Sequence, residues 1–249
     1  MSDITDITRQ YPRNEGYMEK YIEYQKKYSM SIRESDKVII EILKRSLVNE
    51  SHTKVLDIGC STGNLLSHLN HFFPTMKLVG GDLSDLQIES CKNNLSLKNI
   101  EFRVADITNL NYEAEFDYVI ANAVLCGLED DDFSLAAESI SKALKPEGAL
   151  IAFDWFHPWK QELTILEKSG NLPEGYVLHF RSYNRVRELL SLGGYRSINF
   201  MPFEIKINLP QPDFQTNFLE TYTIPTSSGE LLQFRGVINQ PWNHMIARK

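Results

Sequence analysis

Short apolar runs alternate with helix-length segments through the middle of the chain. The runs typical of buried strands are Lys54 to Ile58, Lys77 to Gly81, Ile100 to Ala105, Phe116 to Ala121 and Ala149 to Phe153. They are apolar at almost every position, as expected for strands that are covered on both faces. Strands that alternate with helices form βαβ units, so the pattern predicts an α/β fold with a parallel sheet.

Two helices are predicted before the first of these strands. Tyr17, Tyr21, Tyr24 and Tyr28 recur at helical spacing, which places four rings on one face. These rings either pack against the body of the protein or roof a polar pocket, because tyrosine has an apolar body and a polar tip. The apolar stripe of the second helix comprises Val38, Ile39, Ile42 and Leu47.

Two helices inside the strand-rich region carry clear start signals. Ser84 and Gln87 form a capping box after Asp82. A second helix is predicted from Glu129 to Leu144, with three aspartates in its first turn. Because the helix dipole favours anions at the N-terminus, we interpret this acidic run as a helix start and expect no metal site there.

The pattern changes at about residue 158, which divides the chain into zones 1–52, 53–157 and 158–249. The last zone is predicted to hold one helix and several strands. The helix runs from Tyr183 to Leu192, and the strands are Ser197 to Ile207, a hairpin of Leu219 to Pro225 with Leu231 to Ile238, and Trp242 to Ala247.

Composition narrows the range of partners. The chain has 249 residues, a formal charge of −7 and no block of Lys and Arg, so a nucleic-acid partner is not expected. Its longest apolar stretches, such as Ala123 to Leu128, are too short to cross a bilayer, and its N-terminus does not resemble a leader. Three widely spaced cysteines predict neither disulfides nor zinc. We therefore expect a soluble, cytoplasmic protein without a membrane partner.

The segment from Val55 to Asn64 carries the strongest chemical signal, since a buried strand runs into small residues and then a helix. Such a loop lets the backbone approach a ligand closely and directs helix N–H groups at it. The dinucleotide fingerprint G-x-G-x-x-G fails at Ser61 and Asn64. An isolated loop of this kind is also a common structural turn.

The following strand ends extend this signal. Asp82 ends the next strand and is placed to accept hydrogen bonds from both hydroxyls of a ribose. Asp106 follows the third strand, and Asn122 with Ala123 follows the fourth. Ligands of open parallel sheets bind at the carboxyl ends of the strands, so these residues are expected to form one continuous site.

Together these residues resemble the class I S-adenosylmethionine-dependent methyltransferases. The stretch from Asp57 to Gly63 is similar to the family's D-x-G-x-G-x-G loop, with Ser61 in place of the middle glycine. Further matches are Phe116 to Ile120 and Leu144 to Leu150. The resemblance implies a Rossmann-like sheet of seven mostly parallel strands with helices on both faces and an antiparallel last strand. Residues 1–52 would be a helical lid, 53–157 the cofactor-binding core, and 158–249 the completion of the sheet and the acceptor region.

The resemblance also implies S-adenosylmethionine as cofactor and a set of residues around it. Asp82 would lie at the ribose, Asn122 and Ala123 would lie near the sulfur, and Leu83, which follows Asp82, is also expected to bind the cofactor. Arg33 is either a partner of the cofactor carboxylate or a solvated surface residue. The remaining residues that the resemblance implies are Asp57, Gly59, Cys60, Ser61 and Gly63 around the methionine end, with Asp106 and Ile107 at the adenine.

The acceptor is less clearly encoded. Asn122 is not followed by Pro-Pro and Cys126 is not preceded by Pro, which disfavours two classes of nucleic-acid methyltransferase. The acidic pair and Asn of metal-dependent catechol enzymes are not recognisable. We therefore expect methyl transfer to oxygen or nitrogen of a polar small molecule, such as a sugar or another secondary metabolite. The alternatives are another transfer in the same pocket, or a catalytically silent cofactor-binding scaffold or sensor subunit.

His157 is the best candidate for a general base, because it follows the fifth strand and so lies at the ligand edge of the sheet. The alternative is a histidine whose ring is satisfied by backbone hydrogen bonds. His179, Arg181 and His244 are weaker candidates, and the pattern does not indicate an oligomeric state.

Overall fold

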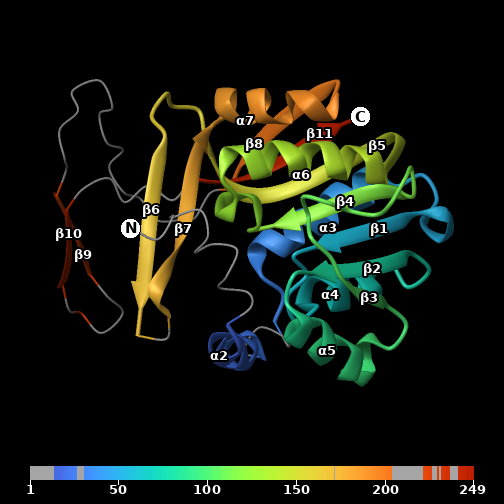
Figure 1. Ribbon diagram of the computed structural model, residues 1–249, viewed down its shortest axis with the longest axis horizontal. Helices are drawn as coiled ribbons and strands as arrows, with labels where there is room; N and C mark the ends of the chain where they lie inside the picture. Colours follow the sequence, from blue (N-terminus) through green and yellow to red (C-terminus); the bar gives the residue numbers. More distant parts are fainter. Residues whose placement is uncertain are drawn as a thin grey trace.

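The computed structural model describes residues 14–26, 31–170, 172–203, 221–225, 229, 231–235 and 241–249. Its main sheet has the strand order β3-β2-β1-β4-β5-β11-β8 (Figure 1). The strands are β1 (Lys54–Ile58), β2 (Lys77–Asp82), β3 (Glu101–Val104), β4 (Phe116–Asn122), β5 (Leu144–His157), β8 (Ser197–Pro202) and β11 (Trp242–Arg248). The first five are parallel, whereas β11 is antiparallel to both of its neighbours. The predicted, mostly parallel sheet with an antiparallel last strand is therefore confirmed, but the complete sheet has nine strands where seven were predicted, because the hairpin described below joins it through β5.

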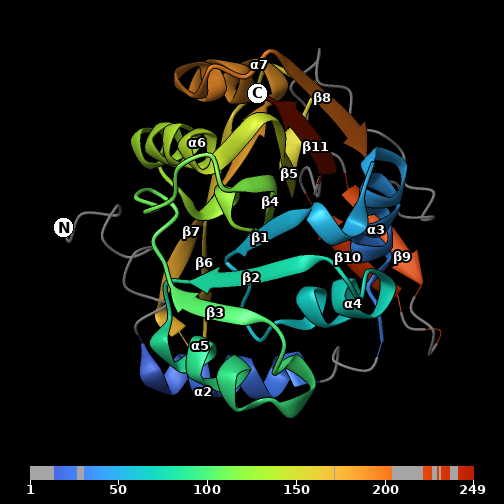
Figure 2. The same cartoon turned by 90° about the vertical axis from the view of Figure 1, so that its right-hand side faces the viewer.

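Helices cover both faces of this sheet and give it two separate cores. The helices of the described residues are α2 (Glu15–Gln25), α3 (Glu34–Ser46), α4 (Asn64–Phe72), α5 (Asp85–Asn93), α6 (Asp130–Ala143) and α7 (Tyr183–Leu190). Short 3-10 turns are η3 (Glu50–His52), η4 (Leu95–Leu97), η5 (Leu125–Gly127) and η6 (Ser191–Gly193). In β4, Val119 and Ala121 belong to the core under α6 and α7, and Ile120 belongs to the core under α3 and α4. Figure 2 shows α6 and α3 on opposite sides of the sheet. Burial on both faces explains the continuous apolar runs.

A hairpin of β6 (Leu163–Ser169) and β7 (Leu172–Ser182) stands beyond the carboxyl ends of the parallel strands, with β1 and β4 pointing toward it (Figure 1). The sequence pattern did not predict this hairpin. It also placed the end of the fifth strand too early, because β5 continues to His157 and pairs Phe156 and His157 with Arg181 and Ser182 of β7.

The hairpin that the sequence does predict is present as β9 (Thr221–Pro225) paired antiparallel with β10 (Leu231–Arg235). The parts of that prediction at 219–220 and 236–238, the end of the strand predicted to reach Ile207, and Tyr28 lie outside the described residues. The described part of the chain contains no helix of the length and apolar character needed to cross a membrane.

The N-terminal helices differ in how they meet the body. α3 buries Ile39, Ile40 and Leu43, so its stripe is rotated from the predicted one, and Ile42 and Leu47 are only partly buried. The N-cap of α2 is Asn14, whose side chain accepts a hydrogen bond from the Tyr17 N–H at 3.1 Å. Figures 1 and 2 both show α2 beside α5, below the carboxyl ends of the strands.

Candidate functional site

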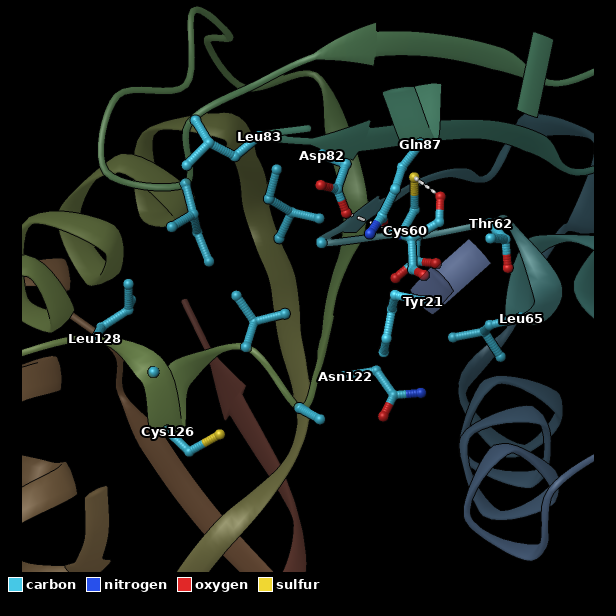
Figure 3. Close-up of a pocket in the computed structure, with 18 of the residues that line it drawn as sticks. Tyr21, Cys60, Thr62, Leu65, Asp82, Leu83, Gln87, Asn122, Cys126 and Leu128 are labelled. Atoms are coloured by element: carbon cyan, nitrogen blue, oxygen red, sulfur yellow. Dashed lines mark hydrogen bonds between the residues drawn. The ribbon is translucent and has the colours of Figure 1, made fainter. Parts of the chain in front are cut away.

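A pocket of about 970 Å³ lies at the carboxyl ends of the parallel strands (Figure 3). Loops after β1, β2, β3 and β4 form its floor, α2 contributes a roof, and β7 and the start of β11 close one side. The lining includes eleven of the predicted cofactor residues: Arg33, Asp57, Gly59, Cys60, Ser61, Asp82, Leu83, Asp106, Ile107, Asn122 and Ala123. The strand ends that were predicted to form one continuous site therefore line a single cavity.

The loop after β1 has an unusual backbone. Gly59, Ser61 and Gly63 have φ values of 78°, 51° and 74°. A Cβ at Gly59 would lie 2.4 Å from Val124 Cγ2, so this position accepts only glycine in this conformation. Ser61 adopts the left-handed region despite its side chain, and its N–H donates to Asp82 Oδ2 at 2.9 Å. This hydrogen bond helps to hold a strained turn open toward the pocket.

Asp82 ends β2 and is held rigidly. Its Oδ1 accepts the Ser84 N–H at 2.9 Å, while Oδ2 accepts the Ser61 N–H. Burial raises the pKa of Asp82, and these backbone N–H groups oppose the rise. Each carboxylate oxygen has two lone pairs, so both can still accept a hydrogen bond from a ligand hydroxyl.

Two more carboxyl groups, those of Asp57 and Asp36, line the pocket. Asp57 is 2% exposed, and its Oδ1 has no hydrogen-bond partner among the described residues. Burial, with the charges of Asp36 and Asp82, raises the pKa of Asp57 to about 8. Asp36 of α3 accepts a hydrogen bond from Asn122 Nδ2 at 3.1 Å, and burial raises its pKa as well. This crowding of carboxyl groups suits a ligand that carries positive charge and hydroxyl groups, and S-adenosylmethionine has both.

The roof comes from the tyrosine face of α2. Tyr17, Tyr21 and Tyr24 all line the pocket, which confirms the second of the two interpretations of this face. Tyr17 and Tyr21 stack with their centroids 6.1 Å apart. Gln25 connects the C-terminal end of α2 to the body of the protein. Its side-chain oxygen accepts a hydrogen bond from Arg33 Nη2 at 2.7 Å, and its backbone carbonyl oxygen accepts one from Asn64 Nδ2 at 3.2 Å.

The opposite end of the pocket is aromatic. Figure 3 shows Cys126 and Leu128 on the far side of the pocket from Thr62 and Leu65. We call this part the aromatic end, and it comprises Cys126, Leu128, Trp155, Tyr176, Leu178 and Trp242. Trp155 stacks on Phe180 at 4.2 Å and Trp242 on Phe153 at 4.6 Å, so rings outside the lining fix both indoles. Glu129 and Asp132, at the start of α6, line the same pocket.

Two predicted site residues do not line the pocket. His157 is 2% exposed, stacks on Trp159 at 5.2 Å, and has its pKa lowered by burial. The expected position of its imidazole beside an acceptor is therefore wrong, because β5 continues through His157 into its pairing with β7. Gly63 is also outside the lining, where a Cβ would lie 2.8 Å from Leu97 Cδ1. Its role here is to cap α4 in a left-handed conformation.

The weaker candidates have structural contacts. His244 Nε2 lies 3.0 Å from the Ser35 carbonyl oxygen, and burial lowers its pKa to about 4. Arg181 is 3% exposed and donates to Asp130 and to the carbonyl groups of Leu125 and Leu128. His179 Nε2 lies 3.3 Å from Glu129 Oε1, which puts it directly behind a lining residue.

Sequence reasoning missed several lining residues because no motif marks them. They are Met18, Asp36, Gln87, Leu128, Glu129, Asp132, Trp155, Tyr176, Leu178 and Trp242. The acidic run at 129–132 was correctly assigned to a helix start, yet it also faces the pocket. Within the described ranges, no three His, Cys, Asp or Glu side chains gather as metal ligands.

Comparison with known proteins agrees with this geometry. The model of a methyltransferase domain family matches residues 49–190. The chain belongs to this family and, with this fold and loop, to the class I S-adenosylmethionine-dependent methyltransferases.

Similar sequences include a malonyl-[acyl-carrier protein] O-methyltransferase from Bacillus cereus, 26% identical over 58% of this chain and 51% of that protein. Another is a trans-aconitate 2-methyltransferase from Escherichia coli, 31% identical over 57% of this chain and 55% of that protein. The chain thus spans about half the length of these curated relatives.

Among solved structures, a methyltransferase from Methanosarcina mazei has a TM-score of 0.56 at 16% identity, covering 84% of this chain and 96% of its own. Human N-acetylserotonin methyltransferase, solved in complex with S-adenosylmethionine, has a TM-score of 0.55 at 16% identity over 94% of this chain and 55% of its own. At this identity both likenesses show the fold alone.

Proposed function

We propose that this chain transfers the methyl group of S-adenosylmethionine to a small-molecule acceptor. The observation that carries the proposal is one pocket with two chemically different ends. The end at the loops after β1 and β2 is rich in carboxyl groups and backbone N–H groups, and the other end is aromatic. In-line displacement needs donor and acceptor in one cavity, and Asn122 lies between the two ends in Figure 3.

The cofactor would occupy the end formed by the loop after β1. Asp82 would accept hydrogen bonds from the ribose hydroxyls, while Leu83 and Ile107 would contact the adenine. Arg33 would pair with the carboxylate of the cofactor, and the positive charge of the bound cofactor would favour the ionised forms of Asp36 and Asp57, whose pKa values are raised in the unbound protein. When bound, the cofactor supplies a methyl carbon already activated by the sulfonium charge, so the protein's main task is alignment.

The aromatic end would hold the acceptor and exclude water from it. Its position beyond Asn122 favours an enzyme over a silent scaffold or sensor subunit, because such a subunit has no need of a second cavity. The acceptors in the names of the two relatives are those of proteins of which this chain spans about half the length. Transfer of a group other than methyl in this same pocket remains an outcome of the experiment below.

Isothermal titration with S-adenosylmethionine, its demethylated product and NAD tests the cofactor assignment. We expect the two sulfur compounds to bind and NAD not to bind. Asp82→Ala should weaken cofactor binding by about 1.5–3 kcal/mol, the range for hydrogen bonds to a charged group. Asp85→Ala is the matched control, since Asp85 is exposed and outside the pocket lining.

Product analysis completes this test. Methylated product from a small-molecule panel supports methyl transfer, and a different product would establish another transfer. Binding of NAD in place of the sulfur compounds, or unchanged affinity in the Asp82 variant, would contradict the assignment.

A further inference from the structure

The aromatic end is built from side chains that attract positive charge. Trp155, Tyr176 and Trp242 all line it, and Phe180 and Phe153 hold the two indoles from outside the lining. The two indoles also contact each other edge to face, with their centroids 5.0 Å apart, so the pocket meets only the parts of the indoles that these three contacts leave uncovered. The face of an indole or phenol ring carries negative potential, which attracts an ammonium group within about 6 Å of the ring.

Carboxyl groups, whose negative charge also attracts an ammonium group, line the same pocket or adjoin one of these rings. Glu129 and Asp132 line the pocket from α6, and Glu167 pairs across the hairpin with Tyr176. Among the described lining residues Arg33 is the only cation, and it lies at the α2 side, bonded to Gln25. Arg181, behind the 3-10 turn η5, is matched by Asp130.

The basic side chain beside Glu129, that of His179, does not neutralise the negative charge of Glu129. His179 Nε2 lies 3.3 Å from Glu129 Oε1, and burial together with Arg181 lowers the pKa of His179. A histidine with a lowered pKa is mostly neutral near pH 7. Glu129 is therefore not cancelled by its nearest basic group.

We propose that the acceptor binds through an amine at the aromatic end, and that Glu129 selects it against neutral and carboxylate-bearing molecules. This rests on the proposed function, because it concerns the acceptor half of the same pocket. The amine arrives as an ammonium ion and gives one proton to Glu129, from which His179 can carry it outward. The lone pair of the neutral amine nitrogen then forms the N–C bond as the C–S bond breaks, and the electron pair of the C–S bond stays on sulfur.

Three probes that share one body test the charge preference. They are 2-phenylethylamine, 2-phenylethanol and 3-phenylpropionate, which differ in the charge of the head group. Each is titrated into protein saturated with the demethylated cofactor, so binding is read without turnover. We expect the amine to bind about tenfold more tightly than the alcohol, corresponding to about 1.4 kcal/mol, and the carboxylate to bind most weakly.

Paired variants locate the source of the preference. Glu129→Gln should reduce the preference for the amine to less than about threefold while the affinity for the alcohol is kept. This change keeps the helix start, because the Glu129 side chain makes no cap hydrogen bond. Asp131→Asn is the matched control, as Asp131 is exposed in the same turn and outside the lining.

The possible outcomes separate the two proposals. If the demethylated cofactor does not bind, the proposed function fails. If it binds but the carboxylate equals or exceeds the amine, or none of the probes binds, the amine proposal is overturned and the cofactor assignment stands. An amine preference that survives unchanged in Glu129→Gln overturns the role given to Glu129.

Discussion

Asp57 lies near the end of β1 in a position that is costly for a charged carboxylate. It is buried, and its Oδ1 has no hydrogen-bond partner in the described part of the chain. Burial is the largest cause of its raised pKa, and the charges of Asp36 and Asp82 add to it. The folded protein therefore keeps a proton on Asp57 at pH values where the unfolded chain has released it.

This difference sets the sign of a pH effect on stability. Because the folded-state pKa is about 8 and the ordinary value of an aspartate is 3.8, the contribution of Asp57 to the free energy of unfolding is fully present below about pH 4. It is lost as the pH rises toward 8, by up to about 1.4 kcal/mol per pH unit. Asp57→Asn should flatten this slope in the unbound protein, as measured by urea unfolding between about pH 5 and 8. Asp85→Asn, at an exposed position, should keep the wild-type slope, and an equal slope in Asp57→Asn would contradict the assignment.

At the scale of elements, the parallel core was predictable and the β6–β7 hairpin was not. Strands such as β1 and β4 are buried on both faces, so most of their residues are apolar and the polar ones lie near their ends. The residues of β6 include several exposed side chains, and their pairing with β7 gives no local signal. The α3 stripe was mispredicted because Ser35 and Asp36 occupy its buried face, where Asp36 bonds Asn122. Polar residues buried for such contacts cannot be found from hydrophobic periodicity.

Arg181 joins the elements that form the aromatic end. From β7 it donates to Asp130 at the start of α6 and to the carbonyl groups of Leu125 and Leu128, on either side of the turn that carries Cys126. Arg181→Met would remove the Arg181 donor from the Leu128 carbonyl group and one of two donors from that of Leu125, which also accepts the Leu128 N–H, so we expect a loss of about 1–3 kcal/mol in the free energy of unfolding. Probe binding at the aromatic end should weaken more than cofactor binding.

The matched control is Arg185→Met, because Arg185 pairs with the same Asp130 but its side chain is 40% exposed. We expect a cost below about 1 kcal/mol for this partly exposed pair. Equal losses from both variants, measured by urea unfolding, would show that the buried carbonyl contacts of Arg181 contribute no additional stability.

At the scale of the whole molecule, the pocket joins parts of the chain that are far apart in sequence. Its cofactor end lies on consecutive strand ends of one βαβ series, which is why the loop after β1, Asp82 and Asn122 could be placed from the sequence. The aromatic end joins Trp155, Tyr176 and Trp242, which meet only because β7 and β11 both approach the end of β5. Long-range pairing of this kind carries no local signature, and His157 was misplaced for the same reason.

α2 is the element expected to respond most to the ligand. Its fully buried residues are Met18 and Gln25, while Tyr17, Tyr21 and Tyr24 face the pocket. A helix with so few buried residues gains much of its packing from whatever fills the space beneath it, and lids over active sites are drawn from such weakly held elements.

Amide exchange of residues 15–25 should therefore slow at least about tenfold when the demethylated cofactor binds, because exchange falls with the population of the open state. Amides of α7, outside the pocket lining, should change by no more than the global stabilisation. If α2 and α7 slow equally, ligand binding stabilises the molecule as a whole and α2 does not act as a lid.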